Sequence, residues 1–405
     1  MKILIIGSPK LPIPPTLGGG VPTLLYNGLA LQNERLEGNI FYFVSPFDPK
    51  AKEQGDRLIR SKFIYAHFPA IPVMLDRFLA WFFGKLLRRK RTMSLSYINR
   101  TLWYNHFVKK VLLQGDYDKV VVENSIPVLR CFKPRRIKKQ YQGKLFFHSH
   151  SFIRRFYGAK KVFLFCNKIF VVSEFMKNDL LKNKDLLPIK NKIEVLKNKV
   201  ELSSFFSPAS EAWSIRAKIG ASPSDFLVLF VGRFTKEKGI SELLDAFSLI
   251  PDPQIKLVIV GSYFYNSGIA SSFEIEMKKK ALQLGNRAIF TGYVSQEELI
   301  ALYQQSDVCA LPSTWDEPAG VTMIEALAAG CPLITTRSGG IPEYMGQNNC
   351  ILLDLNSNLV RSMADSIVLL KNDLARRMEM SKRGQLQAKT LTIESYLPDF
   401  LKRIQ

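Results

Sequence analysis

Short runs of β-branched and aromatic residues alternate with amphipathic stretches along the chain, and this alternation predicts repeated β-α-β units. In the first half, such runs predict strands over residues 2–6, 39–44, 119–122, 144–147, 168–172 and 192–196. The rhythm restarts in the second half, with strands predicted over residues 226–231, 256–260, 288–291, 308–311 and 333–335. Helices are predicted between the strands, including residues 240–249, 296–304 and 322–329. Strands that alternate with helices in this way form parallel sheets covered by helices.

A chain of 405 residues exceeds what one hydrophobic core supports, so we expect two domains. A polar, serine-rich stretch at residues 201–224 is predicted to connect them. We expect an N-terminal domain over residues 1–205, a C-terminal domain over residues 206–390 and a last helix over residues 391–405 that crosses back to the N-terminal domain. The predicted fold class is α/β, with two doubly wound, Rossmann-like domains facing each other across a cleft. Ligands of such sheets bind at the carboxyl ends of the strands.

Composition narrows the class of protein further. Apolar residues make up 47% of the sequence and charged residues 23%, which excludes a disordered or fibrous protein. No apolar run approaches the roughly 18–20 residues that span a bilayer, and the N-terminal run is too short for a signal peptide. The five cysteines show no CxxC spacing, so neither a disulfide framework nor a zinc site is indicated. We therefore expect a cytoplasmic protein.

The excess of Lys and Arg over Asp and Glu lies entirely in the first half of the chain. The net charge is +22; residues 1–200 carry 37 Lys and Arg against 13 Asp and Glu, whereas residues 201–405 carry 20 against 22. Such a basic region attracts polyanions, either nucleic acid or the anionic face of a membrane, or else serves solubility alone. Because no nucleic-acid-binding module and no aromatic stacking platform is recognisable, we expect no nucleic-acid partner. A peripheral position on the inner face of the cell membrane is the expectation.

Two segments concentrate this charge. Within residues 71–113, apolar and aromatic side chains precede a basic cluster: Leu75, Phe78, Leu79, Trp81, Phe82 and Phe83, then Lys85, Arg88, Arg89, Lys90 and Arg91. This pattern is typical of a helix in a membrane interface, and equally of an ordinary amphipathic helix packed on a core. A second basic cluster at residues 133–139 could extend the same positive face or form a solvated loop.

A glycine-rich loop follows the first predicted strand. Gly18, Gly19 and Gly20 precede a helix that is expected to begin at about Pro22. Glycines let backbone amides approach an anion, and a helix N-terminus adds partial positive charge. The loop lacks the GxGxxG pattern of dinucleotide-binding folds, so it indicates either a phosphate cradle or a mobile loop.

In the second half, the strand over residues 226–231 leads into the sequence GRFTKEKG. Arg233 and Lys238 flank this turn, where both could reach a diphosphate, the arginine in a bidentate manner and the lysine as a point charge. The alternative is a pair of structural ion pairs to Glu237 or Glu242.

The sequence EPAGVTMIEALAAGCPLI, beginning at Glu317, predicts a loop, a helix, a small-residue turn and a strand. Glu317 lies in the loop and Glu325 about one turn into the helix. Amides at Gly320 and the two following residues would point toward a ligand and hold a phosphate or sugar oxygen. Two carboxylates on either side of this helix start can accept hydrogen bonds from sugar hydroxyls, or they can be structural groups that cap the helix or form salt bridges.

These motifs closely resemble the nucleotide-sugar site of family-4 retaining glycosyltransferases, which have the GT-B fold. The resemblance is to the members of that family that build bacterial surface polysaccharide and lipopolysaccharide. The pattern Glu317-x7-Glu325 and the VGRFTKEKG segment carry the resemblance. The glycine loop and the His148-Ser149-His150 segment also fall where that family places functional residues.

The resemblance implies a role for each matching residue. Glu317 would lie by the donor sugar near the reacting carbon, and Glu325 would hold the ribose hydroxyls. Arg233 and Lys238 would neutralise the diphosphate, which Gly19 and Gly20 would also reach from the N-terminal domain. The nucleotide pocket would be completed by Tyr293, Val294, Ala319, Gly320, Val321 and Thr322. Either His148 or His150 would contact the donor sugar, or either could simply be packed at a strand end.

Two departures from the family pattern are evident. The family often has Phe or Tyr where Ala319 stands, and its usual Asn-Gly-Val-Asp appears here as Asn-Lys-Val-Glu at residues 198–201. No DxD motif is placed to recruit Mg²⁺, so we expect metal-independent transfer without a cofactor, with the nucleotide diphosphate sugar as donor substrate.

The expected function is a retaining transferase that moves a hexose or N-acetylhexosamine from a nucleotide diphosphate sugar, with UDP as the expected nucleotide. The acceptor would be a glycan or lipid-linked glycan in cell-surface polysaccharide synthesis. The alternatives are a nucleotide-sugar epimerase on the same fold and a non-catalytic surface or coat protein that retains it.

Overall fold

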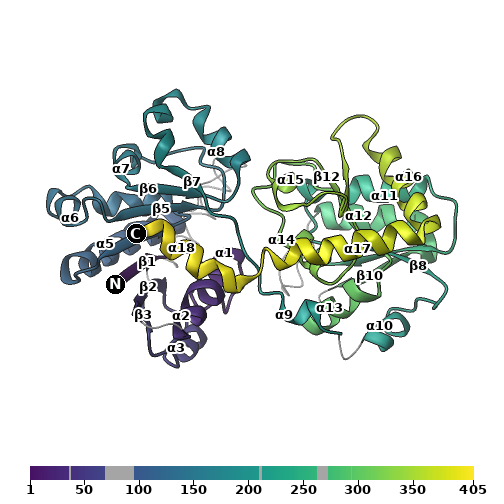
Figure 1. Ribbon diagram of the computed structural model, residues 1–405, viewed down its shortest axis with the longest axis horizontal. Coiled ribbons are helices and arrows are strands. Elements are labelled where there is room, and N and C mark those ends of the chain that lie inside the picture. The colour runs from purple at the N-terminus through teal and green to yellow at the C-terminus, as the bar shows by residue number, and fades with distance from the viewer. Residues whose placement is uncertain (36–37, 69–94, 209–211, 262–271, 293) are drawn as a thin grey trace, which may run out of the picture. The chain divides into compact units, whose positions relative to one another are not determined.

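The computed structural model describes residues 1–35, 38–68, 95–208, 212–261, 272–292 and 294–405. Contacts divide the chain into two compact units (Figure 1). Unit 1 comprises Met1–Lys197 and Ile393–Gln405, and unit 2 comprises Asn198–Thr392. Across the described ranges, no helix is both long and apolar enough to cross a membrane. The aromatic and basic residues of the expected membrane-interface helix, at positions 75–91, lie outside the described residues.

Unit 1 is built on a seven-stranded sheet in which every strand is parallel to its neighbours. Its order is β3-β2-β1-β4-β5-β6-β7, which is the order of a doubly wound Rossmann sheet with one further strand. The strands are β1 (Lys2–Ile6), β2 (Ile40–Pro46), β3 (Ser61–Ala66), β4 (Lys119–Glu123), β5 (Leu145–Ser149), β6 (Lys168–Val171) and β7 (Ile193–Val195). The helices are α1 (Gly20–Leu25), α2 (Gln32–Glu34), α3 (Pro49–Gly55), α5 (Leu95–Gln114), α6 (Arg135–Gln140), α7 (Lys160–Phe165), α8 (Glu174–Leu181) and α18 (Tyr396–Ile404), with a π-helical turn at Tyr26–Leu31 and 3-10 segments at Ile126–Phe132, Lys184–Lys192 and Ile393–Ser395.

Unit 2 repeats the same topology with a six-stranded parallel sheet in the order β10-β9-β8-β11-β12-β13. Its strands are β8 (Phe226–Val231), β9 (Ile255–Val260), β10 (Ala288–Gly292), β11 (Val308–Leu311), β12 (Leu333–Thr336) and β13 (Cys350–Leu353). Its helices are α9 (Ser203–Phe206), α10 (Ala212–Lys218), α11 (Ile240–Ser248), α12 (Ser272–Ala281), α13 (Gln296–Gln305), α14 (Val321–Ala328), α15 (Ile341–Tyr344), α16 (Leu359–Asn372) and α17 (Leu374–Lys389), with 3-10 segments at Lys236–Lys238 and Leu282–Arg287. The predicted fold class, α/β with two doubly wound Rossmann-like sheets, is confirmed.

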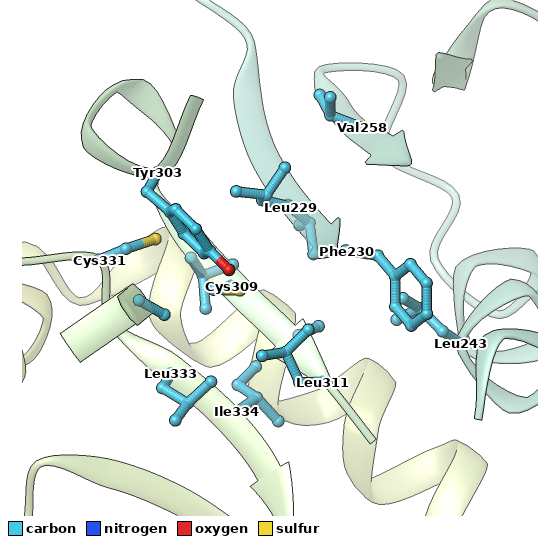
Figure 2. Packing of buried hydrophobic residues seen from close by; sticks show 14 of the residues in the cluster. Leu229, Phe230, Leu243, Val258, Tyr303, Cys309, Leu311, Cys331, Leu333 and Ile334 are labelled. Atoms are coloured by element: carbon cyan, nitrogen blue, oxygen red, sulfur yellow. The ribbon is translucent and has the colours of Figure 1, made fainter. Parts of the chain in front are cut away.

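The central strands are hydrophobic at almost every position because helices cover both faces of a parallel sheet. Strand β8 has the sequence FLVLFV, and five of its six residues are buried. Figure 2 shows part of this core, where side chains from β8, β11 and β12 meet those of α11 and α13. Burying such aliphatic and aromatic side chains is the main stabilising contribution to the unit, at roughly 25 cal/mol per Å² of apolar surface.

The C-terminal helix α18 packs in unit 1, beside the first elements of the chain (Figure 1). Its buried residues Phe400 and Ile404 join a core that includes Phe41 and Leu29. The apolar residues of α18 recur at helical spacing, so one stripe of the helix is buried.

The structure corrects the expected connection at residues 201–224. This stretch carries α9 and α10 and belongs to unit 2, because Leu202, Phe205 and Ile215 are buried in the unit 2 core. The division of the chain therefore falls after Lys197 rather than after residue 205. The hydrophobic pattern also failed to predict β3 and β13, two edge strands in which several residues are only partly buried.

Candidate active site

The candidate site in unit 2 lies at the carboxyl ends of β8 and β11, the adjacent central strands where the strand order reverses. In open α/β sheets this switch point is where ligands bind, since the loops that leave the two strands run to opposite faces. The loop after β8 carries Arg233 and Lys238, and the loop after β11 carries Glu317. Parallel pairing of the two strands thus brings together side chains that are about eighty positions apart in sequence.

Lys238 and Glu317 form an ion pair at the centre of this edge. The Lys238 Nζ donates to Glu317 Oε1 at 2.5 Å, and the Ser313 hydroxyl donates to the same carboxylate oxygen at 2.9 Å. The side chain of Glu317 is only 7% exposed, whereas that of Lys238 is 27% exposed. A carboxylate with this little exposure needs a cation or donors beside it. These contacts therefore hold the Glu317 carboxylate in a fixed position, while its lysine partner still reaches solvent.

Backbone contacts fix the two loops against each other. The amide of Thr314 donates to the carbonyl of Glu237 at 2.9 Å, and the hydroxyl oxygen of Ser313 lies 3.0 Å from the same carbonyl oxygen. Gly239 adopts φ +70°, and a Cβ there would lie 1.8 Å from the carbonyl oxygen of Pro312. Only glycine permits both this backbone conformation and this close approach. The GRFTKEKG segment therefore ends in glycine for a structural reason that also positions Lys238.

A turn that the sequence motifs did not indicate supports Glu317 from the other side. Ser338, Gly339 and Gly340 follow β12, and the amide of Gly340 donates to the carbonyl of Glu317 at 2.7 Å. A Cβ on Gly339 would lie 2.4 Å from that carbonyl oxygen. The Ser338 hydroxyl donates to the carbonyl of Trp315. A Ser-Gly-Gly sequence directly after a predicted strand was the available signal for this turn.

Glu325 differs from Glu317 because, within the part of the chain that the structure describes, it forms no ion pair with a cation. It occupies the fifth position of α14, and its polar neighbour is the hydroxyl of Tyr303 on α13, which lies 3.5 Å from Glu325 Oε2. Burial raises the pKa of Glu325 to about 7, and the weak hydrogen bond from Tyr303 offsets only part of that effect. A carboxyl group in this state can accept hydrogen bonds from ligand hydroxyl groups when it is ionised.

Other predicted donor-site residues lie around these two glutamates. Arg233 is exposed, and among the described residues its guanidinium forms no ion pair within 4 Å, although its charge helps to lower the pKa of the neighbouring Glu237. Gly320 is the N-cap of α14 and has no side-chain cap, so the first amides of the helix, at Val321 and Thr322, lack intrahelical acceptors. Ala319 and Val294 pack against the unit 2 core. Tyr293 lies outside the described residues.

Gly19 and Gly20 belong to unit 1, in the loop between β1 and α1. The helix begins at Gly20, two residues earlier than expected, with Gly19 as its N-cap. Gly19 has φ +109°, and a Cβ there would lie 2.6 Å from a methyl carbon of Leu11. Gly20 is exposed, and a Cβ there would have no neighbouring atom within 4 Å among the described residues. The loop is thus placed at the carboxyl end of the first central strand, as its sequence position predicts.

His148 and His150 lie at the carboxyl end of β5 with a third residue, Glu123 of β4, which the sequence motifs did not indicate. His148 Nδ1 lies 3.2 Å from Glu123 Oε2, and His150 Nε2 lies 3.0 Å from the same oxygen. Burial alone would raise the pKa of Glu123, but the two histidines outweigh it and lower that pKa to about 2. Burial and the neighbouring His150 lower the pKa of His148. His148 is fully buried, whereas the side chain of His150 is 4% exposed.

The match to a protein family falls within unit 2. Residues 211–387, which lie within unit 2, match the family described as Glycosyl transferases group 1. The uncharacterized glycosyltransferase MJ1607 of Methanocaldococcus jannaschii is 32% identical over 160 residues, which cover 38% of this chain and 39% of that protein. The matched region thus spans about two fifths of that relative's length. Arg233, Lys238, Glu317 and Glu325 all lie within the residues that match the family.

Two further similarities extend over the whole chain. The putative glycosyltransferase YtcC of Bacillus subtilis is 24% identical over 401 residues, which cover 96% of this chain and 88% of that protein. The crystal structure of Anabaena Alr3699/HepE in complex with UDP-glucose superposes with a TM-score of 0.72 at 17% identity, covering 99% of this chain and 98% of that one. The chain therefore has the GT-B fold of glycosyltransferases.

Proposed function

We propose that the protein is a retaining glycosyltransferase that moves a hexose or N-acetylhexosamine from a nucleotide diphosphate sugar, with UDP as the nucleotide, to a glycan or lipid-linked glycan of the cell surface. The observation that carries this proposal is the group formed by Lys238, Glu317 and Ser313 at the switch point of unit 2. It lies within the residues that match the glycosyl transferase family. The donor would bind at this edge of the sheet.

The geometry supports a separate role for each group of residues in the transfer step. When the bond between the anomeric carbon and the diphosphate oxygen breaks, its electron pair leaves with the diphosphate, and negative charge develops there. Lys238, Arg233 and the first amides of α14 can stabilise this charge, which is commonly the largest contribution to such catalysis. The acceptor hydroxyl oxygen then bonds to the anomeric carbon, and its proton passes to the departing diphosphate oxygen. We propose that this step uses these protein groups and no metal ion.

The glutamates would hold the donor. Glu317, fixed by Lys238 and Ser313, would accept hydrogen bonds from hydroxyl groups of the sugar near the reacting carbon. Glu325 would accept hydrogen bonds from the ribose hydroxyls, because its contact with the Tyr303 hydroxyl, at 3.5 Å, is long and leaves the carboxylate oxygens able to accept shorter bonds. Val294, Ala319 and Gly320 would form the wall beside the nucleotide.

An anionic membrane surface is the proposed location of the acceptor. In unit 1, α6 and the residues before it expose Lys133, Arg135, Arg136, Lys138 and Lys139, while Ile137 on the same helix is buried. A row of exposed cations over one buried anchor can bind anionic lipid headgroups at about 1 kcal/mol per cation. The fraction of the protein that sediments with anionic vesicles should therefore fall when these five cations are neutralised together.

The experiment that tests the proposed transfer is a thermal-shift titration with UDP, GDP, ADP and TDP, each in EDTA and in Mg²⁺. A nucleotide at a hundred times its Kd should stabilise the fold by about 2.7 kcal/mol. Stabilisation by UDP in EDTA supports the proposal, and the variant Glu317→Gln should then lose release of UDP from a UDP-sugar in the presence of acceptor. Full activity of Glu317→Gln would contradict the site, and no response to any nucleotide would favour a non-catalytic coat protein.

The product of turnover distinguishes a transferase from an epimerase. A transferase releases free UDP in proportion to the glycosylated acceptor, whereas an epimerase converts the sugar while it remains attached to the nucleotide or releases nucleotide without any acceptor. Incubation with each UDP-sugar, with and without a lipid-linked acceptor mixture, followed by chromatography of the nucleotides, separates the two activities.

A further inference from the structure

We infer that Glu123, His148 and His150 form a binding site for one divalent transition-metal ion in unit 1. This inference goes beyond the proposed transfer reaction, whose charged residues lie in unit 2. It also replaces the direct contact with the donor sugar that the family resemblance implies for one of the histidines.

The sheet itself brings the three side chains together. Glu123 and His148 are register partners on the adjacent parallel strands β4 and β5, so their side chains project from the same face. His150 lies two residues beyond His148 and returns to that face, and its amide donates to Asn124 Oδ1 at 3.0 Å. Asn124 in turn has φ +50° and donates its own amide to the carbonyl of His148 at 2.7 Å. The cluster therefore rests on the paired ends of β4 and β5 and on the contacts of Asn124 with the backbone of His148 and His150.

The distances fit a common central ion. Glu123 Oε2 lies 3.2 Å from His148 Nδ1 and 3.0 Å from His150 Nε2, and one ligand atom from each residue lies within 4.8 Å of the others. In a tetrahedral site with metal-ligand bonds of about 2.0 Å, ligand atoms lie about 3.3 Å apart. Small rotations of the side chains would bring all three atoms to that separation.

Unsatisfied polar atoms in the cluster point to a ligand. Within the described residues, Glu123 Oε1 and both ring nitrogens of His148 have no hydrogen-bond partner, and both side chains are 0% exposed. The contact of His148 Nδ1 with Glu123 lacks hydrogen-bond geometry despite its length. A buried polar group without a partner destabilises the fold, because the water it had in the unfolded chain is not replaced. A cation that binds the carboxylate and one ring nitrogen of each histidine would remove this penalty at Glu123 and at one of the two ring nitrogens of His148.

The donor set selects the class of ion. Two imidazoles and one carboxylate suit Zn²⁺, Co²⁺, Ni²⁺ or Fe²⁺, whereas Mg²⁺ and Ca²⁺ prefer oxygen ligands throughout. The ring of Phe170, the register partner of His148 on β6, stands nearly perpendicular to the His148 ring with centroids 6.0 Å apart. This apolar wall limits access of water on one side. A bound ion would join the carboxyl ends of β4 and β5.

The test uses the full chain without an affinity tag, because a histidine tag binds the same metals. The protein is stripped with EDTA, desalted, given two equivalents of Zn²⁺ and desalted again, and its zinc content is measured by mass spectrometry. We expect one zinc per wild-type chain and a Zn²⁺-dependent rise in melting temperature that Mg²⁺ does not produce. Glu123→Gln should bind Zn²⁺ at least about 100-fold more weakly, since even the loss of a residue that only orients a metal ligand weakens binding about 10–100-fold. None of these readouts requires nucleotide or sugar, so they stand apart from the proposed transferase activity.

A matched control and a spectroscopic measurement complete the test. His106 is an exposed histidine on α5, and His106→Asn should keep the full zinc content. Retention of tight binding by Glu123→Gln, or no zinc in the wild type, would overturn the site and leave the cluster as a hydrogen-bonded network. If Glu123→Gln fails to fold, the visible spectrum of Co²⁺ bound to the wild-type protein decides whether the site exists. Visible bands of cobalt held by nitrogen and oxygen support the site, whereas a cysteine-to-cobalt charge-transfer band or the spectrum of aqueous Co²⁺ overturns it.

Discussion

The two units place glutamates at equivalent edges of the same topology but surround them differently. Glu123 ends β4, and Glu317 follows β11; each of these strands neighbours the first strand of its sheet. Glu317 is held by the ammonium group of Lys238 and the hydroxyl of Ser313. Glu123 has imidazoles beside it instead, and one of its oxygens has no hydrogen-bond partner among the described residues.

This difference shows that the fold fixes where a carboxylate lies, while the neighbouring loop decides what it can do. In unit 2 the loop after β8 supplies a lysine that still reaches solvent, so the edge can receive an anion. In unit 1 the loop after β1 supplies glycines, and buried histidines stand beside the carboxylate in place of a lysine. If both proposals hold, the two edges bind different ligands, an anionic nucleotide in unit 2 and a cation in unit 1.

Removal of the charge of Lys238 should have the largest effect on the proposed activity of unit 2. Lys238→Met keeps the apolar stem and removes the charge, and we expect transfer activity to fall about 10²–10³-fold because charge on the departing diphosphate loses its main partner. Release of UDP under saturating donor measures the effect. Lys236→Met is the matched control, since Lys236 is exposed in the same 3-10 turn and should leave activity within about twofold of wild type. Equal losses in the two variants would contradict a specific role for Lys238.

The glycines of the two loops offer a second contrast. Gly239 and Gly18 have almost the same backbone conformation, φ +70° and +72°, but of the two only Gly239 has a described neighbour where a Cβ would be placed. Gly239→Ala should lower the free energy of unfolding by about 3 kcal/mol, from backbone strain and displacement of the Pro312 carbonyl. Gly18→Ala should lower it by about 1 kcal/mol, from strain alone. Chemical denaturation of both variants measures the difference, and similar losses would show that the close approach to Pro312 is relieved at little cost.

Much of the fold could be predicted because the central strands of both sheets are continuous apolar runs. β8 and β11 were predicted with the bounds that the structure gives them, since strands buried on both faces tolerate almost no polar residue. In β3, by contrast, only the two end residues are buried, so its pattern is weaker. The polar stretch at residues 201–224 was wrongly predicted to be a connection because its core residues Phe205 and Ile215 lie among serines.

The candidate site was predictable where its residues are close in sequence. Glu317 and Glu325 are separated by one helix turn and a loop, and Lys238 follows a recognisable strand. Glu123 was missed because only the parallel register of β4 and β5 brings it to His148, 25 positions later. Gly340 was missed for the same reason, since its contact with Glu317 requires β12 to lie beside β11.

A third carboxyl group, that of Glu325, should make the free energy of unfolding depend on pH. Its pKa is raised to about 7 in the folded chain from an ordinary value of 4.5, so the folded state binds more protons than the unfolded state between these values. The free energy of unfolding should therefore decline by about 1–3 kcal/mol as the pH rises from about 4.5 to 7. In Glu325→Gln this contribution is absent, and the variant should be more stable than wild type at about pH 8 while it binds UDP more weakly. Identical pH profiles of unfolding for the two proteins would contradict a raised pKa.

The smallest expected effect concerns Arg233, the exposed cation of the same loop. Because its guanidinium has no ion-pair partner among the described residues, Arg233→Ala should leave the free energy of unfolding within about 0.5 kcal/mol of wild type. The affinity for UDP should fall about three- to tenfold, and the loss should shrink at high salt, since an exposed charge is screened over about 10 Å at 0.1 M ionic strength. Arg233→Lys should restore part of the affinity, because a lysine supplies the charge without the bidentate geometry. Calorimetric titration with UDP at two salt concentrations measures these changes. If Arg233→Ala leaves the affinity for UDP unchanged, the anion site consists of Lys238 and the amides of α14 alone. The two units would then differ, in the charged groups that face an anion, by the single residue Lys238.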